Sequence, residues 1–435
     1  MRGRRSSVLA GDGYQVNAAL NQVRTLAMRA RRKAKRDRVE RGFIEASARV
    51  PGANAFAGLN PMSLAVASVR PSDQVRPRVS LIVPEIKAEA IFAGIRTALE
   101  VSVGVANSLE LPLRIFALWD EPNPRASASI REFLRDEFGL SRWAEVEVLH
   151  VSALTGLAVS ADELWIGTHW TTVHPLDVAA RLNVIRPDRV IYLAQDYEPG
   201  FYPWSTEFAL ARATYHAGFR MVVNSEPLAA YLRDAEQLDV DPALVFAPSL
   251  DLGRLEESAA NRRKSAQPSV MFYGRPNKPR NLFAIGISAL KLSATSPANT
   301  GVSYSSVGES HATVALSGTT TLASRGKLSW QAYFELLSNT DVMFSLQHSP
   351  HPSHPPLDSV VSGGITVTNE LAGTRAALHP RLLTAEPDPT LLGQRLNDAI
   401  EMARSSEPAG FDSTFITKLG APLTDVVKHA SALVA

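Results

Sequence analysis

Carboxylates and aromatic side chains crowd the stretch 195–207, which follows an apolar run of strand length at 189–194. The residues with chemistry to offer are Asp196, Glu198, Glu207, Tyr197, Phe201, Tyr202 and Trp204. Aromatic faces stack on sugar rings, and carboxylates hold hydroxyls or act as general bases. We expect Asp196 and Glu198 to be catalytic. The residues expected to bind a sugar-containing substrate, the acceptor, are Tyr197, Tyr202, Trp204 and Glu207. A structural role stays open, in which the carboxylates cap a helix beginning near Thr206 and the rings pack in the core.

A second stretch, 272–281, joins the end of a strand to the start of a helix through a basic loop. The strand ends at Gly274, and three cations follow it: Arg275, Lys278 and Arg280. We expect the helix to begin near Asn281. In open α/β sheets ligands bind beyond the carboxyl ends of the strands, and cations beside a helix N-terminus suit a diphosphate. A basic surface loop is the alternative, and the local sequence does not decide between the two.

The third stretch, 349–358, is rich in proline and leads into a helix that carries Asp358 in its first turn. Prolines exclude a helix before Pro356 but are favoured at the first helical position. Such a loop can present His351, Ser353 and Asp358 to a nucleotide-bearing ligand. The histidines of this stretch raise the question of zinc, but prolines flank them and no acidic ligand lies among them. We therefore expect no metal site.

Two weaker candidates follow other strands. Gly94, after the first strand, allows a ligand to approach the backbone, although a glycine at such a place also serves helix–sheet packing. His169 follows the apolar run 164–167. We expect His169 to be a satisfied polar residue rather than a base.

The elements that must position these side chains alternate along the chain from residue 78 onward. Strands are expected at 79–84, 113–119, 146–151, 164–167, 189–194, 221–224, 269–273, 302–307, 341–346 and 365–368. Helices are expected at 88–106, 130–138, 281–290, 330–337 and 391–404. Short buried strands that alternate with helices form parallel sheets covered on both faces. The sequence therefore predicts an α/β protein with two doubly wound, Rossmann-like domains that face each other across a cleft.

Four segments are expected in this chain of 435 residues. Residues 1–70 form an extension with a helix at 17–41, followed by a linker at 50–71. The two domains occupy 71–260 and 261–405, with the polar stretch 255–268 at their boundary. Residues 406–435 form a helical segment that is expected to pack back on the first domain.

Composition excludes several classes of protein. The chain has no Cys, which removes disulfides, thiolate zinc sites and cysteine nucleophiles. No apolar run has the length of a membrane span, and the N-terminus lacks the apolar core of a secretory signal, so a cytoplasmic location is expected.

Positive charge is concentrated at the N-terminus, where the first 50 residues carry 13 Lys/Arg against 4 Asp/Glu. The basic stretch 24–41 is typical of a solvated helix face, and an anionic membrane surface is the alternative partner. No nucleic acid is expected, because no aromatic platform or recognition motif accompanies the charge.

Taken together, the segments 195–215, 272–281 and 349–358 resemble, in order and spacing, the bacterial rhamnosyltransferases of the GT-B fold. These enzymes build surface polysaccharides from dTDP-rhamnose. The resemblance spans about 78–369. It implies an acceptor-side domain at 71–260, a donor-nucleotide-binding domain at 261–405, and a retaining transfer of rhamnose to a hydroxyl of a growing cell-surface glycan. The nucleotide sugar is then a co-substrate, and no cofactor or metal is needed. The expected location is cytoplasmic, and the inner face of the plasma membrane is an alternative suggested by the basic stretch 24–41.

On this interpretation the donor-binding residues are Gly94, Arg275, Lys278, Arg280, Asn281, His351, Ser353 and Asp358. Many retaining enzymes of this fold carry two Glu eight positions apart in the donor loop, where this chain has Pro350 and Asp358. His354 also stands where members of the family tend to have Tyr. A UDP- or GDP-sugar donor is therefore an alternative. A non-catalytic scaffold of a membrane-associated glycan assembly is an alternative from another class.

Overall fold

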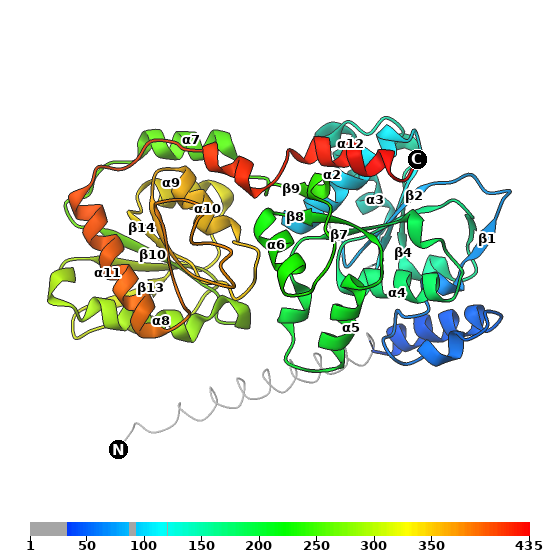
Figure 1. The fold of residues 1–435 in the computed structure, drawn as a ribbon, viewed down its shortest axis with the longest axis horizontal. Coiled ribbons are helices and arrows are strands. Elements are labelled where there is room, and N and C mark those ends of the chain that lie inside the picture. The colour runs from blue at the N-terminus through cyan, green and yellow to red at the C-terminus, as the bar shows by residue number, and fades with distance from the viewer. Residues whose placement is uncertain (1–32, 87–92, 120) are drawn as a thin grey trace, which may run out of the picture.

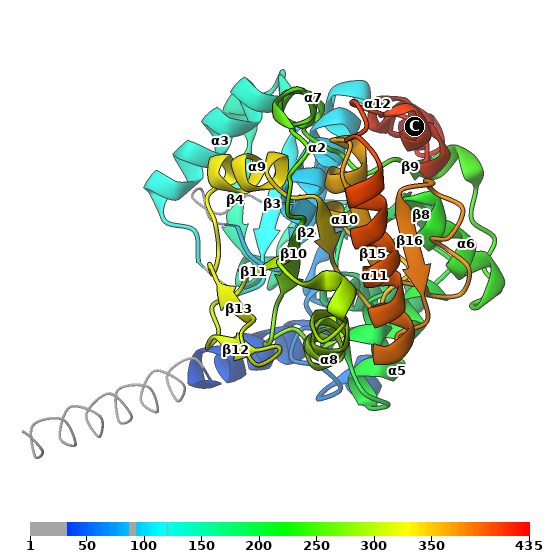
Figure 2. The same cartoon turned by 90° about the vertical axis from the view of Figure 1, so that its left-hand side faces the viewer.

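Two seven-stranded sheets lie side by side, each at the centre of its own domain (Figure 1). The computed structural model describes residues 33–86, 93–119 and 121–435. In Figure 1 the first domain lies on the right and the second on the left, and Figure 2 looks at the second domain end on.

The first sheet has the order β4-β3-β2-β6-β7-β8-β9, and each neighbouring pair is parallel. Its strands are β2 (Val79–Val83), β3 (Leu113–Ala117), β4 (Glu147–His150), β6 (Leu164–Gly167), β7 (Val190–Ala194), β8 (Arg220–Asn224) and β9 (Val245–Phe246). Every residue of β2, β3, β6 and β7 is buried, because helices cover both faces of the sheet. The strand order reverses between β2 and β6, which is where a doubly wound sheet opens to a ligand.

Helices cover the first sheet in two layers. On one face lie α2 (Ala93–Ser108), α3 (Pro124–Phe138) and the C-terminal helix α12 (Leu423–Ala432). On the other face lie α4 (Trp170–Arg181), α5 (Thr206–Tyr215) and α6 (Glu226–Asp234).

The second sheet has the order β12-β13-β11-β10-β14-β15-β16, and only its β12–β13 edge pair is antiparallel. Its strands are β10 (Ser269–Gly274), β11 (Ser303–Gly308), β12 (Val314–Ala315), β13 (Thr321–Ser324), β14 (Val342–Phe344), β15 (Ile365–Asn369) and β16 (Leu382–Ala385). One face packs against α8 (Phe283–Ala294) and α11 (Pro389–Ser405). The other packs against α7 (Leu252–Asn261), α9 (Trp330–Ser338) and α10 (His354–Val361).

These two facing Rossmann-like domains confirm the GT-B arrangement expected from the sequence. Two local expectations are wrong. The beginning of the polar boundary stretch 255–268 belongs to α7, which buries Leu255 and Ser258 against the second domain. The helix expected from Asn281 begins at Phe283, after a 3-10 turn, η9 (Pro279–Asn281).

The stretch 50–71 is also not the linker that its composition predicts. It forms two 3-10 turns, η1 (Ala53–Phe56) and η2 (Val66–Ser68), and buries Met62 and Leu64 in the core of the first domain. Its last residues open β1 (Arg70–Ser72), which pairs with β5 (Ala158–Ser160) in a small parallel sheet.

The end of the expected N-terminal helix is described, and residues 33–47 are helical. Phe43 of this helix is fully buried in the first domain. The rest of the basic extension, residues 1–32, lies outside the described residues.

The end of the chain returns to the first domain. After α11 the chain passes through the turn η11 (Thr414–Leu419), and α12 then lies against α2, where Val426 and Val427 join the core under the first sheet (Figure 1). Among the described residues, no helix is both long and apolar enough to span a membrane.

Candidate active site at the domain interface

Asp196 lies at a contact between the two domains. It follows β7 in the first domain, and its Oδ1 accepts a hydrogen bond from the hydroxyl of Ser349, which follows β14 in the second. The guanidinium of Arg280, on η9, approaches the other carboxylate oxygen at 3.9 Å and lies 4.1 Å above the ring of Phe201. The structure thus brings one predicted catalytic residue to a predicted donor-binding residue.

Opposing effects act on the pKa of the Asp196 carboxyl. Burial raises the pKa of its carboxyl, whereas the charge of Arg280 and the hydrogen bonds from Ser349 and from its neighbour Tyr197 oppose that rise. A carboxylate whose pKa is raised by burial is a stronger base than an exposed one.

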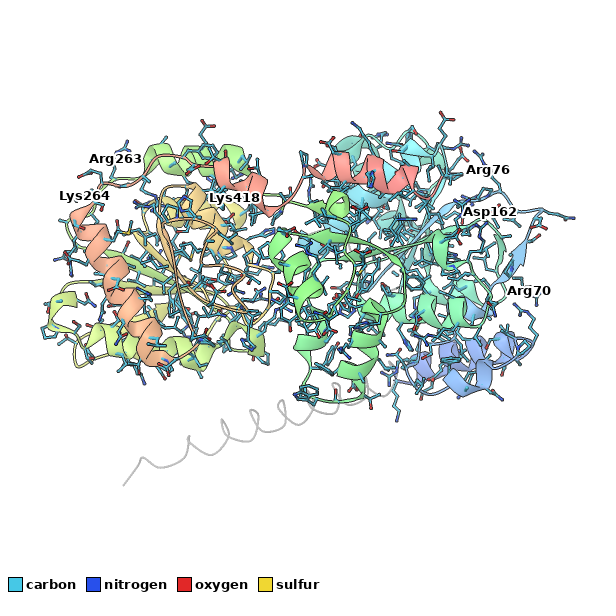
Figure 3. The ribbon with its side chains drawn as sticks, in the orientation of Figure 1. Arg70, Arg76, Asp162, Arg263, Lys264 and Lys418 are labelled. Atoms are coloured by element: carbon cyan, nitrogen blue, oxygen red, sulfur yellow. The ribbon has the colours of Figure 1, made fainter. Side chains whose placement is uncertain are left out.

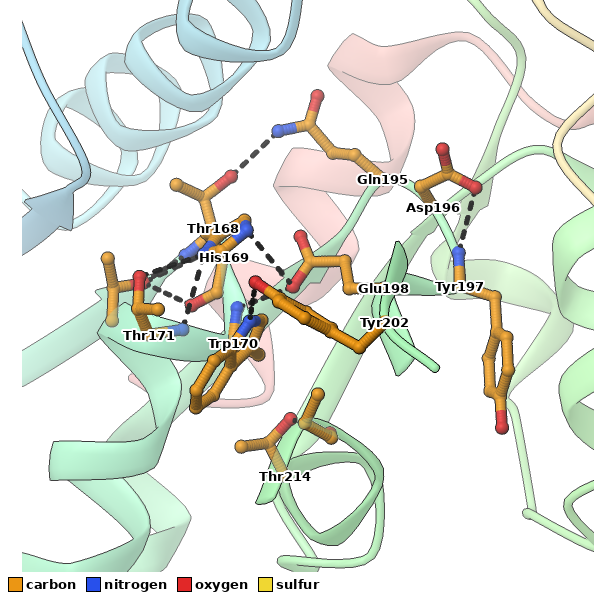
Figure 4. Close-up of polar contacts among 12 residues, drawn as sticks. Thr168, His169, Trp170, Thr171, Gln195, Asp196, Tyr197, Glu198, Tyr202 and Thr214 are labelled. Carbon is orange, nitrogen blue, oxygen red and sulfur yellow. Dashed lines mark hydrogen bonds and ion pairs between the residues drawn. The ribbon is translucent and has the colours of Figure 1, made fainter. Parts of the chain in front are cut away.

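Glu198 follows Asp196 by two positions, and its carboxylate points toward His169 and Trp170 at the start of α4 (Figure 4). Its Oε2 accepts the backbone N–H of Trp170 at 2.5 Å and lies 3.9 Å from Nε2 of His169. The residue is only 5% exposed, and burial raises the pKa of its carboxyl well above the ordinary value. Glu198 therefore caps the N-terminus of α4. The helix near Thr206, which the sequence left open as its structural partner, is α5, and its cap is Ser205.

His169 lies between Glu198 and the end of β6. Its Nδ1 accepts the backbone N–H of Thr171, so the neutral ring carries its proton on Nε2, the atom that faces Glu198. Burial, with a smaller contribution from Arg280, lowers the pKa of His169 to about 4. The imidazole is thus neutral near pH 7, in line with the satisfied polar residue that we expected.

The expected acceptor residues are dispersed. Tyr202 lies beside the site, where its hydroxyl accepts from the indole N–H of Trp170 at 2.9 Å. Trp204 is 91% exposed, and its ring contacts that of Phe208 in a tilted arrangement. Glu207 lies exposed in the first turn of α5.

The expectation for Tyr197 is wrong. Its ring is buried between Tyr215 and Tyr231, and its hydroxyl donates to Glu236. In Figure 4 the side chain points away from Asp196, because the backbone turns at the strand end and sends successive side chains in opposite directions.

Gly94 is close to the same site, but the space beside its Cα is occupied by the side chain of Gln195. The side chain of Gln195 donates to Gly94 O at 2.9 Å and to the hydroxyl of Thr168 at 2.7 Å. Gln195 thus links the ends of β6 and β7 to the first turn of α2 (Figure 4).

The cations of the basic loop after β10 have different surroundings. Arg275 lies 3.8 Å from the carboxylate of Glu309, which also accepts the backbone N–H of Asn277. Lys278 is exposed.

The expectation that Asn281 binds the donor at an exposed helix N-terminus is wrong. It is 1% exposed, and its amide donates to Leu346 O in the core of the domain. The α8 helix begins only after Leu282, whose φ of 50° turns the chain.

The proline-rich loop places His351 inward. Its Nδ1 accepts the backbone N–H of Ser353, and its Nε2, which then carries the proton, is buried without a partner in the structure. Burial lowers the pKa of His351 to about 3, so the ring is a neutral hydrogen-bond donor. Ser353 has a φ of 68°, a left-handed conformation that is strained for serine and turns the chain into α10.

Asp358 lies in α10, which begins at His354 and not at Pro356, so Asp358 is beyond the first turn in which we expected it. Its Oδ2 accepts from the hydroxyl of Tyr333 on α9 at 2.9 Å, and burial raises its pKa to about 7. Among the described residues, no group of three or more His, Cys, Asp or Glu is placed to hold a metal ion.

Sequence reasoning missed Arg375 and Glu309, which lie at strand ends of the second domain beside the predicted donor residues. Arg375 is fully buried and donates to backbone carbonyls of the loop 347–351. No local pattern marks either residue, because their partners are distant in sequence. Only Glu309 had a signal, its position just after the expected strand 302–307.

Two family models match the chain. Residues 78–226 match the model described as WsaF, N-terminal domain, and residues 268–397 match WsaF, C-terminal domain. Together these stretches take in more than half of the chain and follow the order of its two domains. The chain belongs to the WsaF family of glycosyltransferases. In the numbering of this chain, the stretches matched by the WsaF models include Asp196, Arg280, Ser349 and Arg375.

A curated relative of this chain is an O-antigen biosynthesis protein, RfbC, from Myxococcus xanthus. It is 27% identical over 290 residues, which are 66% of this chain but only 21% of that protein. The chain thus spans about a fifth of the length of this curated relative.

Solved structures similar to this WsaF family member are distant. One is a sucrose-phosphate synthase from Thermosynechococcus elongatus, with 12% identity, a TM-score of 0.45, and coverage of 82% of this chain and 94% of that chain. Another is a UDP-forming trehalose-phosphate synthase from Burkholderia vietnamiensis, with 10% identity, a TM-score of 0.49, and coverage of 82% and 97%. At this identity, neither structure bears on the donor or the acceptor of this protein.

Proposed function

We propose that this protein transfers a sugar from a nucleotide-sugar donor to a hydroxyl of a growing cell-surface glycan. The observation that carries the proposal is the meeting of Asp196 with Arg280 and Ser349 at the ends of strands from both domains. A carboxylate from one domain thereby lies beside a cation and a hydroxyl from the other. The name of the O-antigen biosynthesis relative supports a role in polysaccharide synthesis.

In the proposed reaction the bond between the anomeric carbon and the diphosphate oxygen breaks, and a bond to the acceptor oxygen forms. The acceptor hydroxyl loses its proton to Asp196, and the nucleoside diphosphate leaves with the electron pair. The Ser349 hydroxyl already donates to Asp196, which supports the idea that this carboxylate accepts from a hydroxyl. Arg280 and Arg275 would neutralise the departing diphosphate, a kind of contact whose loss costs about 3–4 kcal/mol in the transition state.

His351 would complete the donor side, because its protonated Nε2 lacks a partner and suits an oxygen of the donor. We propose dTDP-rhamnose as the donor, with a UDP- or GDP-sugar as the alternative, and a retaining, metal-independent reaction. These finer proposals rest on the resemblance of the segments 195–215, 272–281 and 349–358.

The test is a binding and turnover screen. The purified chain is titrated by calorimetry with dTDP, UDP and GDP, and then incubated with the matching nucleotide sugars and lipid-linked glycans with and without EDTA. We expect dTDP to bind most tightly and nucleoside diphosphate to be released only when an acceptor is present. Failure of all three nucleotides to bind would overturn the proposed function.

A further inference from the structure

Arg375 is a buried cation without a matching anion. It is 0% exposed, and none of the ion pairs found among the described residues includes it. Its guanidinium instead donates to backbone carbonyls, to Asn369 O at 2.5 Å, Gln347 O at 2.8 Å and Ser349 O. Carbonyl oxygens satisfy hydrogen bonds but do not cancel a full charge, and a buried charge without compensation is costly.

These carbonyls belong to the loop that faces the other domain. Residues 347–351 carry the Ser349 hydroxyl that reaches Asp196 and the His351 ring with its unpartnered Nε2. Asn369 also bonds to both backbone groups of Gln347, so the ends of β14 and β15 are joined through this network. The planar fork of Arg375 fixes several carbonyls at once, which a lysine cannot reproduce.

The charged groups around Arg375 lie on three elements. Glu370 follows β15, but its carboxylate is already engaged by three backbone N–H groups, of Leu371, Arg375 and Ala376. Asp196 faces Arg375 from the first domain, while Arg280 and the neutral His351 share its surroundings. Nearby anions therefore compensate the positive charge of Arg375 only in part. The compensation is incomplete on the side of Arg375 that faces Asp196.

We propose that Arg375 is a positioning residue that holds the loop 347–351 in shape and places a buried positive charge behind it, where that charge stabilises the diphosphate of the bound donor. This inference rests on the proposed function, because it needs a diphosphate at the ends of β10 and β14. Arg375 touches the loop and not the donor, so its charge acts across the loop backbone.

The chain contains a matched control in Arg262. This residue is 6% exposed and donates to Ser362 O at 2.9 Å, Leu337 O at 2.9 Å and Thr340 O. Its partners precede β14 and β15, whereas those of Arg375 follow them, so the two arginines lie at opposite ends of the same sheet. Its neighbours Arg263 and Lys264 lie at the outer end of the second domain, far from the first (Figure 3). Burial lowers the pKa of both buried arginines to about 10.

The first experiment removes the charge. Arg375→Met and Arg262→Met are compared by thermal unfolding and by calorimetry with the tightest of dTDP, UDP and GDP and with its bare nucleoside. Both variants should unfold at lower temperature. Only Arg375→Met should lose affinity for the diphosphate, by at least ~10-fold more than for the nucleoside, as expected for a lost buried cation. Equal losses for the two ligands would overturn the proposal.

The second experiment makes the charge removable. A buried lysine has a depressed pKa and loses its proton at lower pH than the buried arginine, whose pKa is about 10. The dissociation constant of Arg375→Lys relative to the natural chain should therefore rise at least ~5-fold between about pH 6 and about pH 8.5, where Arg375 itself stays charged. The same ratio for Arg262→Lys should stay flat. A flat ratio for Arg375→Lys would overturn the proposal even if Arg375→Met does not fold.

The two possible failures are distinguishable. If the natural chain binds none of the three nucleotides, the proposed function is wrong. If it binds one of them and the Arg375 variants bind it with the same affinity and the same pH dependence, only the role of Arg375 is wrong.

Discussion

At the scale of single residues, neighbouring side chains with the same chemistry have different surroundings. Asp196 reaches the second domain, whereas Glu198, two positions later, caps α4, and Tyr197 between them turns into the core. Alternation of side chains at a strand end separates them, and the sequence alone does not say which direction faces the ligand. The partner of Tyr197 is Glu236, 39 positions away, so its burial is a tertiary effect that no local pattern contains.

Removing the charge of each carboxylate distinguishes the two roles. Asp196→Asn should fold normally and lower the rate of sugar transfer at least ~100-fold, the lower end of general-base contributions. Glu198→Gln should mainly lower stability, by about 1 kcal/mol, because it weakens a contact at the N-terminus of α4. Initial rates at saturating donor and thermal unfolding of both variants are the measurements. Normal transfer with reduced stability in both would mean that the acidic stretch is structural.

A pH dependence of stability follows from Asp358. Burial raises its folded-state pKa to about 7, above the ordinary value of 3.8, so the folded protein binds more protons than the unfolded chain between these two pH values. The contribution of Asp358 to stability is fully present below about pH 4 and is lost as the pH rises through 7, by about 1.4 kcal/mol for each pH unit between the two pKa values.

Asp358→Asn stays neutral at every pH and accepts the same hydrogen bond from Tyr333. The melting temperature of the natural chain should therefore fall relative to Asp358→Asn between about pH 5.5 and about pH 8.5, by several degrees for about 1–2 kcal/mol. Scanning fluorimetry of the pair is the measurement. A difference that is constant with pH would show that Asp358 is ionised throughout.

At the scale of elements, the strands were the most predictable part. The stretch 164–167 coincides with β6, and the other expected strands differ by a few residues, because burial on both faces leaves an uninterrupted apolar run. The sequence did not predict β1, β5, β9, β12, β13 and β16, because strands of two to four residues carry little pattern. The pairing of β1 with β5 is in addition a tertiary effect. The segment 50–71 was expected to be a linker, because its prolines and glycines are typical of one. It packs on the first domain instead, because Met62 and Leu64 are buried in the core.

Close packing of α2 against α12 gives a further prediction. A Cβ added at Gly104 would lie 2.6 Å from Val427 Cγ1, and valine is stiff, so the two helices would have to separate. Gly104→Ala should destabilise the protein by about 1–3 kcal/mol, although alanine favours a helix.

Gly253, in the first turn of α7, is the control, because no atom lies within 4 Å of the position that an added Cβ would take there. Gly253→Ala should be neutral or stabilising by up to about 1 kcal/mol. Urea unfolding of the two variants is the measurement, and equal stabilities would contradict the tight packing of α12.

At the scale of the whole molecule, the basic extension is separable only in part. Phe43 and Ser47 are buried in the first domain, so a deletion through residue 50 would damage its core. A deletion of residues 1–32 removes much of the positive charge and spares these contacts.

That deletion should leave the melting temperature and sugar transfer nearly unchanged and should lower co-sedimentation with vesicles of anionic lipid. High salt should have the same effect on the full chain, because the Debye length shrinks to about 3 Å at 1 M. Vesicle binding that survives both treatments would rule out the extension as the membrane contact.

The return of α12 to the first domain also has a consequence for the order of folding during synthesis. Val426, Val427, Ala430 and Val434 complete the core on one face of the first sheet, yet they are synthesised only after the whole second domain. Domains near the N-terminus generally fold first as the chain emerges. Here the α2 face of the first sheet lacks its contacts with α12 until the second domain has been made. A chain that stops before Leu423 should therefore retain a foldable second domain and an aggregation-prone first one.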